Sequence, residues 1–167
     1  SSTAMDLKLK GKRALITGAT RGMGRAIAET LAGEGCNLSI CARKEKEVAA
    51  TVESLQAKGI TAYGAAVDVT RDAEVKDWVA KSAGQLGGLD IIVSNVGAMD
   101  LGTGRDSWEK NFNLDVMGLV NLVEAGEPFL EDAAKENGDA AIIAISSTAA
   151  AAISNAQSYG AVKAALI

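Results

Sequence analysis

The sequence of 167 residues indicates an α/β protein built on a doubly wound parallel sheet. Three observations support this. Strand-like and helix-like segments alternate along the chain. The strand-like segments are apolar enough to be buried on both faces, and a glycine-rich turn joins the first of them to a helix. Right-handed crossovers, with a reversal of strand order after the third strand, would place the first strand beside the fourth and open a ligand crevice between their carboxyl ends.

Five strands and the helices between them are expected from the pattern of apolar residues. The expected strands are residues 13–16, 37–41, 61–67, 91–93 and 140–145. The expected helices are residues 22–34, 44–58, 72–86, 106–135 and a segment that begins at residue 155. Strands 91–93 and 140–145 should be buried on both faces. Pro128 should kink or interrupt the long fourth helix, because proline has no backbone N–H to donate.

Composition and charge exclude several functions. A formal charge of −4 without clustered Lys and Arg is not the footprint of a nucleic-acid-binding protein. No apolar run approaches the ~20 residues of a membrane span, no secretory signal is recognisable, and Cys36 and Cys41 have neither disulfide nor metal spacing. We therefore expect a cytoplasmic protein without a metal. The absence of histidine removes Ser-His-Asp and Cys-His catalysis, so acid–base chemistry would have to use Tyr, Lys or a carboxylate.

Residues 17–24, with the sequence TGATRGMG, form the turn around which the chain is organised. Glycine lets the backbone approach a ligand closely, and the free N–H groups at a helix start hold a pyrophosphate. An ordinary strand-to-helix turn is the alternative. On the first interpretation residues 11–167 are a dinucleotide-binding domain, and residues 1–10 are a tail that includes a tag remnant. The expected contacts in the turn are Gly18, Thr20, Arg21, Gly22, Met23 and Gly24.

Arg43 follows the second expected strand, at the point that faces the adenosine ribose in dinucleotide-binding folds. An acidic residue there would accept hydrogen bonds from the ribose 2′-hydroxyl, but the first acid is Glu45. Arg43, helped by Arg21, instead offers donors to a 2′-phosphate. The sequence therefore favours NADPH over NADH, the alternative being that these arginines are solvated surface charges.

Two further turns are expected to line the same crevice. Asp68 and Val69 follow the third strand and are placed to flank the adenine. Asn95 and Gly97 follow the fourth strand, where a glycine lets the backbone approach the inner ribose. Each pair on its own is also compatible with ordinary turn chemistry.

Tyr159 and Lys163 lie one helical turn apart, so the phenol and the ammonium can be neighbours. A free phenol ionises only near pH 10, and a nearby ammonium, together with a positively charged oxidised nicotinamide, favours the phenolate. Ser146 and Ser147 follow the fifth strand, where catalytic residues of open α/β sheets collect. One of these hydroxyls could hold a substrate carbonyl beside the phenol, and without histidine neither is activated as a nucleophile.

Together these features resemble the short-chain dehydrogenases/reductases, whose fold is Rossmann-like. The residues that carry the resemblance, in the family's order and spacing, are 17–24, Asp68, 94–97, Asn113, 145–147, Tyr159 and Lys163. The resemblance implies hydride transfer between C4 of a nicotinamide and a carbonyl or alcohol carbon of a small molecule, as in oxoacyl-carrier-protein reductases and sugar or steroid dehydrogenases. It implies that Tyr159 is the acid/base, that Lys163 assists its ionisation and binds the nicotinamide ribose, and that Asn113 holds a water of a proton relay. It also implies a homodimer or homotetramer.

The identity of the catalytic serine depends on which family pattern is followed. The Ile-Ser-Ser strand end favours Ser147, twelve residues before Tyr159. The spacing usual in the family, thirteen residues, favours Ser146. We prefer Ser147, on the assumption of a one-residue deletion in the loop that follows, and keep Ser146 as the alternative.

The resemblance does not extend to the whole length of the family. The chain ends four residues after Lys163, before two further strands, a substrate-covering segment and a last helix that the resemblance implies. We therefore expect that the carboxyl-terminal part is missing. The alternative function is a non-catalytic nucleotide-binding or subunit-interaction module. A nucleotide-sugar epimerase also uses Tyr-x-x-x-Lys, but its glycine loop is spaced differently.

Overall fold

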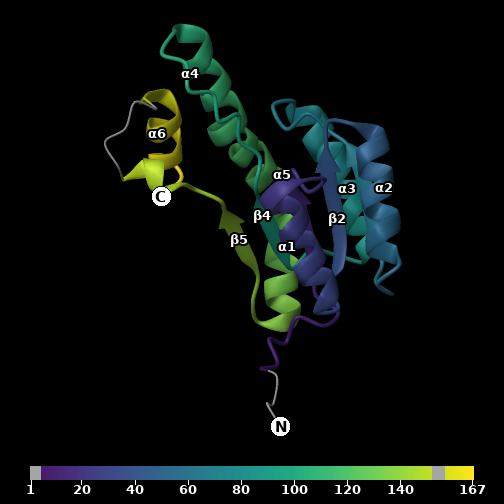
Figure 1. Cartoon of the computed structure of the whole chain (residues 1–167). Helices are drawn as coiled ribbons and strands as arrows, with labels where there is room; N and C mark the ends of the chain where they lie inside the picture. Colours follow the sequence, from purple (N-terminus) through teal and green to yellow (C-terminus); the bar gives the residue numbers. More distant parts are fainter. Residues whose placement is uncertain (1–4, 152–156) are drawn as a thin grey trace.

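The computed structural model describes residues 5–151 and 157–167, and it contains one five-stranded parallel sheet between two layers of helices (Figure 1). The strands are β1 (Arg13–Thr17), β2 (Asn37–Ala42), β3 (Ala62–Ala66), β4 (Ile91–Ser94) and β5 (Ala141–Ala144). The helices are α1 (Gly22–Gly33), α2 (Glu45–Gln56), α3 (Asp72–Leu86), α4 (Arg105–Asn111), α5 (Gly118–Asn137) and α6 (Gln157–Ala164), with a π-helical turn η1 (Phe112–Met117) and a 3-10 turn η2 (Thr148–Ala150). The strand order β3-β2-β1-β4-β5 confirms the expected reversal and brings β1 beside β4.

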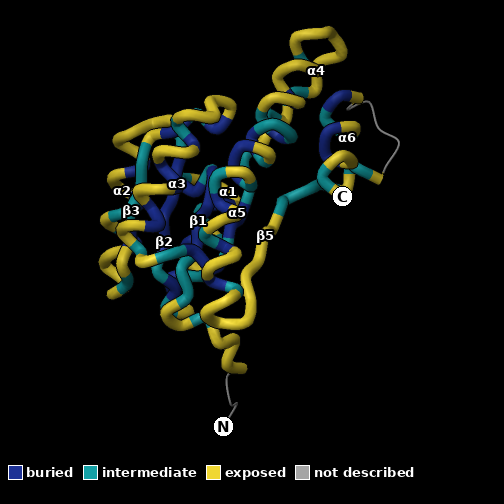
Figure 2. Tube along the Cα trace, turned by 180° about the vertical axis from the view of Figure 1, so that it is seen from behind, coloured by how far each residue is buried: buried dark blue, intermediate teal, exposed yellow. Residues whose placement is uncertain are grey.

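Different helices cover the two faces of the sheet. Helices α1 and α2 pack on one face, where Leu55 and Ile16 belong to the same apolar cluster. Helices α3 and α5 pack on the other face, in a second cluster that contains Trp78 and Leu15. Because successive side chains of a strand point to opposite faces, neighbouring residues of β1 enter different clusters. The central strands are therefore buried from both sides, as the dark blue core in Figure 2 shows.

The fifth strand differs from the expectation of a strand buried on both faces. Residues Ala141, Ile142 and Ile143 are exposed, the last two to 44% and 47%. β5 pairs with β4 along one edge and lies at the end of the sheet, outside the helix layers that cover β1 and β2 (Figure 2). The prediction was wrong because an apolar strand sequence does not say which elements cover it.

The long fourth helix also differs from the expectation. Pro128 was expected to kink or interrupt it, but α5 runs without interruption from Gly118 to Asn137. The irregularity lies earlier, where the helical path passes from α4 through the π-helical turn η1 into α5. A π-helical turn changes which residues share a face and is often found at functional sites. Among the described residues, no helix has both the length and the apolar character needed to cross a bilayer.

A buried ion pair joins β1 and β4 at their amino ends. Arg13 Nε lies 2.8 Å from Asp90 Oδ2, and Arg13 Nη2 donates to Asp90 Oδ1 at 3.0 Å. The Arg13 backbone N–H donates to the same carboxylate at 2.8 Å, and the Asn137 amide at 3.1 Å. Burial raises the pKa of Asp90, but the hydrogen bonds from Arg13 outweigh it, and the pKa lies below its usual value of 3.8. The two strands that flank the predicted crevice are thus held together at their far ends.

Candidate functional site

The glycine turn is held in shape by two backbone conformations and one close contact. Gly18 and Gly22 have φ angles of +64° and +56°, a region that glycine adopts without strain. A Cβ on Gly24 would overlap the Gly18 carbonyl and the Asn95 amide. Among the described residues, no side chain caps the first turn of α1, so the N–H groups at its start have no capping side chain. This geometry fits a pyrophosphate at the start of α1.

The loop after β4 connects the glycine turn to the rest of the site. Asn95 donates through its side-chain amide to the Gly18 carbonyl at 3.2 Å, and its backbone N–H donates to Thr17 Oγ1 at 3.0 Å. Two residues later, a Cβ on Gly97 would lie 2.8 Å from Asp115 Oδ1 and 3.1 Å from Lys163 Nζ. The turn and Lys163 therefore contact the same short loop from two sides.

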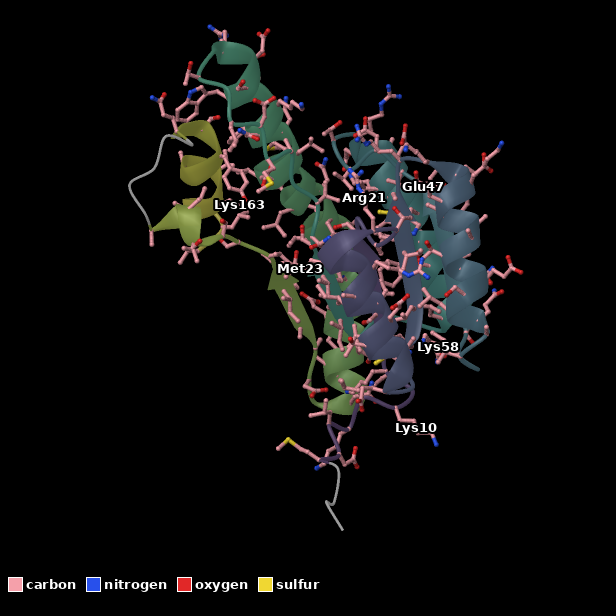
Figure 3. All side chains as sticks on the ribbon, viewed as in Figure 1. Lys10, Arg21, Met23, Glu47, Lys58 and Lys163 are labelled. Carbon is pink, nitrogen blue, oxygen red and sulfur yellow. The ribbon has the colours of Figure 1, made fainter. Side chains whose placement is uncertain are left out.

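Arg21 directly precedes α1, and its charge acts on the carboxylate of Glu47 near the start of α2 (Figure 3). The hydrogen bond from Lys44 is the main cause that lowers the pKa of Glu47, and the charge of Arg21 and a hydrogen bond from Thr20 lower it further. Both Arg21 and Met23 are exposed. In the view of Figure 3, Met23 is labelled beside α1, below Arg21 and Lys163.

Arg43 directly follows β2 and is exposed. It is close enough to Asp68 for its charge to act on that carboxylate. The hydrogen bond from Thr70 is the main cause that lowers the pKa of Asp68, with smaller contributions from the charges of Arg71 and Arg43. Val69, the next residue, is buried in the cluster under α3 and α5. The predicted adenine-side residues thus follow β3, which pairs with β2, and Arg43 is close enough for its charge to act on Asp68.

Tyr159 and Lys163 are brought together on α6, as their spacing predicts. Lys163 Nζ lies 5.8 Å from the centre of the Tyr159 ring and donates to the Ile145 carbonyl at 3.2 Å. Lys163 is only 5% exposed. An ammonium that is nearly inaccessible to water needs a counter-charge, because the desolvation of an isolated ion is costly.

The counter-charge of Lys163 is Asp115, which the sequence reasoning missed. Asp115 Oδ1 lies 2.6 Å from Lys163 Nζ, and Asp115 Oδ2 accepts from the Ala98 N–H at 3.1 Å. Asn113, which the family resemblance assigns to the proton relay, is exposed and is not the residue that pairs with Lys163. Asn111 and Asp115, four residues apart, are both buried, so the i, i+4 spacing is the signal that could have found Asp115.

Asn111, the last residue of α4, anchors α6 to that helix. Its side-chain amide donates to Ser158 Oγ at 2.8 Å and to the Asp100 carbonyl at 2.7 Å. Its side-chain oxygen accepts from the Asp100 N–H at 3.1 Å. Because Ser158 directly precedes Tyr159, this fully buried amide positions the phenol relative to α4 and to the loop after β4.

The two serines after β5 have different hydrogen-bonding states. Ser146 Oγ donates to the Lys163 carbonyl at 2.8 Å. Ser147 Oγ accepts from the Ala149 N–H at 3.2 Å. A hydroxyl has one proton to donate, and Ser146 uses it within the fold, whereas the bond of Ser147 leaves its proton available. Which serine is catalytic stays a prediction, with Ser147 preferred.

The two cysteines are buried, and the described residues contain no group of three or more His, Cys, Asp or Glu arranged to hold a metal ion. Burial raises the pKa of Cys41 to about 12, despite a hydrogen bond from the Gly18 backbone. This thiol therefore remains protonated and packs as a small apolar residue.

Comparison with known proteins agrees with this geometry. Residues 12–167 match the family described as short chain dehydrogenase. Isoepoxydon dehydrogenase patN of Penicillium expansum is 41% identical over 126 residues, which are 74% of this chain and 49% of that protein. The 3-oxoacyl-[acyl-carrier-protein] reductase FabG of Staphylococcus epidermidis is 32% identical over 122 residues, 70% of this chain and 50% of that protein. The chain thus spans about half the length of these relatives.

Solved structures show the same fold. A short chain dehydrogenase from Burkholderia cenocepacia in complex with NADP superposes with a TM-score of 0.85 at 31% identity, over 95% of this chain and 65% of that one. A 7 alpha-hydroxysteroid dehydrogenase complexed with NADH superposes with a TM-score of 0.85 at 29% identity, over 94% of this chain and 62% of that one. The sheet order, the glycine turn and these matches agree, and the chain belongs to the short chain dehydrogenase family.

Proposed function

We propose that the protein is an oxidoreductase that interconverts a small carbonyl compound and its alcohol with NADPH, Tyr159 being the acid/base. The observation that carries the proposal is the loop after β4, which contacts the glycine turn through Asn95 and Lys163 through Gly97. A dinucleotide with its pyrophosphate at the start of α1 can extend along this loop toward Tyr159. When bound, the nicotinamide supplies or accepts the hydride.

The residues of α6 and of the β5 end handle the proton and the substrate. In the reducing direction the Tyr159 hydroxyl gives its proton to the substrate oxygen, which becomes the alcohol hydroxyl; in the oxidising direction the phenolate takes that proton back. We assign Ser147 to donate to the same oxygen and orient it. Lys163 lies beside the Tyr159 ring and is close enough to the loop at Gly97 to bind a ribose hydroxyl there.

The preference for NADPH is supported by the two arginines beside the end of β2. Arg43 and Arg21 are exposed, and each lies near a carboxylate, Asp68 and Glu47 respectively. Guanidinium groups bind phosphate through paired hydrogen bonds, so these side chains suit a 2′-phosphate. The known structures of similar fold were solved with NADH in one case and with NADP in another, so the arginines carry this part of the proposal.

The experiment is turnover of a panel of small ketones, 3-oxoacyl thioesters and alcohols with NADPH or NADP⁺, by the wild type and by Tyr159→Phe. Positioned acid–base groups contribute on the order of 10²–10⁴ in rate, so kcat of Tyr159→Phe should fall by about 100-fold or more. Tyr63→Phe is the matched control, because Tyr63 is the only other tyrosine and lies on β3. Wild-type turnover in Tyr159→Phe would contradict the proposal.

The alternative function is a nucleotide-binding or subunit-interaction module without catalysis, since a glycine turn at a helix start binds a dinucleotide whether or not a reaction follows. Calorimetric titration with NADPH separates the two functions. Binding without turnover of any carbonyl or alcohol of the panel supports the module, and turnover contradicts it.

We also propose self-association as a homodimer or homotetramer. Trp108, Phe112 and Val120 are exposed to 42%, 48% and 37% along the path from α4 through η1 to α5. Large apolar side chains that gather on one surface are typical of protein interfaces. Light scattering of the wild type and of Phe112→Asp tests this, and a monomeric wild type would contradict it.

A further inference from the structure

The ion pair of Asp115 and Lys163 is the most deeply buried in the described part of the chain. The side chains of Lys163 and Asp115 are 7% and 0% exposed, and their nearest charged atoms are 2.6 Å apart. Asp115 Oδ1 accepts no hydrogen bond of ordinary geometry among the described residues, so its contact with the ammonium is one of charge. The other oxygen is bound by the Ala98 N–H, which fixes the carboxylate in place.

Few other charges lie on the elements that pack around this pair. On α4, Arg105, Asp106 and Glu109 are exposed, and Lys110 pairs at 3.2 Å with Asp100 of the loop after β4. The 3-10 turn η2, which also packs on α6, contains only Thr and Ala. On α6 itself Tyr159 is the other ionisable side chain. In the described part of the chain, Asp115 is therefore the one charge that directly offsets the ammonium beside Tyr159.

The charge of Lys163 and that of Asp115 act on Tyr159 in opposite directions. An isolated ammonium near a phenol stabilises the phenolate, whereas a carboxylate near it destabilises the phenolate. The Asp115 carboxylate, 2.6 Å from the ammonium, therefore opposes the effect of Lys163 on the Tyr159 ring, whose centre lies 5.8 Å from the ammonium. The support that Lys163 alone would provide is thereby reduced.

We propose that Asp115 is a positioning residue that holds Lys163 in a neutral pair and so determines how readily Tyr159 gives up its proton. This inference rests on the proposed function for its consequence in catalysis, but the relationship between the three side chains is testable without turnover. In the proposed reaction it makes the phenolate depend on the positive charge of the oxidised nicotinamide more than on Lys163. Alcohol oxidation by the protein should then be favoured at alkaline pH.

The test uses the fact that the chain has two tyrosines. In a Tyr63→Phe background the near-ultraviolet absorbance of tyrosinate reports Tyr159 alone. Stopped-flow pH jumps record it before any alkaline unfolding, and far-ultraviolet circular dichroism confirms the fold. We expect Asp115→Asn, which removes the charge but keeps the size, to lower the midpoint of this titration by about one pH unit or more.

Asp90→Asn in the same background is the matched control. Asp90 is the other buried acid among the described residues, and it lies before β4, at the opposite end of that strand from the site. Its removal takes away one buried charge without changing the surroundings of Tyr159, so the midpoint should stay within about 0.2 units of the wild type, as expected for charges screened over a longer distance. An unchanged or raised midpoint in Asp115→Asn would overturn the proposal.

Asp115→Ser serves as a second variant, because it also removes the charge but is smaller than Asn. The same lowering of the midpoint is expected. If neither variant folds while Asp90→Asn does, Asp115 is required for the fold rather than for tuning, and the proposal is overturned. Absence of turnover in the wild type, with the midpoint shift present, would reject the proposed function and leave this inference standing.

Discussion

The carbonyl oxygen of Gly18 occupies the space that a Cβ on Gly24 would need, so the end of β1 and the first turn of α1 are in direct backbone contact. Gly24→Ala should therefore push the turn apart. Overpacking of this kind costs about 1–3 kcal/mol, and we also expect NADPH binding to weaken by at least about tenfold as the N–H groups of α1 move. Urea unfolding and calorimetry measure the two effects.

The control for Gly24→Ala is Gly84→Ala. Gly84 lies inside α3, and a Cβ there meets no atom within 4 Å. This change should raise the stability by about 0.5–1 kcal/mol, because alanine is the better helix former. Equal behaviour of the two variants would show that the contact between Gly18 and Gly24 has no energetic role.

Arg43→Asp tests the choice of cofactor. Hydrogen bonds to charged groups contribute about 1.5–3 kcal/mol, so the Kd for NADPH should rise about 10- to 100-fold, while the Kd for NADH should fall or stay unchanged. Arg71→Asp changes the net charge equally from the start of α3, where Arg71 contacts Asp68 and Glu74, and should not alter the ratio. Calorimetric titration with both dinucleotides gives the result, and an unchanged ratio in Arg43→Asp would contradict the assignment.

Asp90→Asn tests the ion pair at the amino ends of β1 and β4. Breaking a fully buried pair costs about 3–5 kcal/mol; Arg13 keeps 16% exposure, so we expect a smaller loss, about 2 kcal/mol at pH 7. The pKa of Asp90 is lower in the folded protein than its usual value of 3.8. Its contribution is therefore complete above about pH 4 and is lost as the pH falls through the folded pKa.

Urea unfolding of the wild type and of Asp90→Asn at several pH values measures this dependence. The difference in free energy of unfolding between the two proteins should be constant from pH 7 to about pH 5 and narrow below about pH 4, where Asp90 takes up a proton first in the unfolded state and only at lower pH in the folded state. A difference that widens toward low pH would contradict the sign of the pKa shift.

Asn111→Leu tests the link between α4 and α6. The change leaves the Ser158 hydroxyl and the Asp100 backbone without their partner, at a cost of about 1–3 kcal/mol. Because Tyr159 follows Ser158 and the glycine turn is untouched, kcat should fall by about tenfold or more while the Kd for NADPH changes less than about twofold.

The matched control for Asn111→Leu is Asn121→Leu. Asn121 is a buried amide of α5 that donates to the Val69 carbonyl at 2.9 Å, away from α6. It should lose comparable stability and keep most of its kcat. If Asn111→Leu and Asn121→Leu lose kcat equally, the effect follows from stability and Asn111 does not position the phenol.

The elements of the sheet could be predicted from the sequence because each depends on short-range patterns. Apolar runs bounded by glycines located all five strands, and the glycine turn with the Tyr159–Lys163 spacing located two groups of the site. These patterns concern residues that are close together in the chain, where periodicity and turn chemistry act directly. The same patterns could not say that β5 would be exposed, because coverage depends on distant elements.

The alternation of strands and helices, and the placing of a phenol and an amine on one helical turn, were determined by the sequence itself, because they follow from the backbone geometry of neighbouring residues. The partner of the amine was decided only by the tertiary structure. The sequence predicts Asn113 as the site residue of this segment. The π-helical turn and the packing of α6 on it bring Asp115 to Lys163 instead. Two charges 48 positions apart find each other through the fold, since neither can be buried without the other.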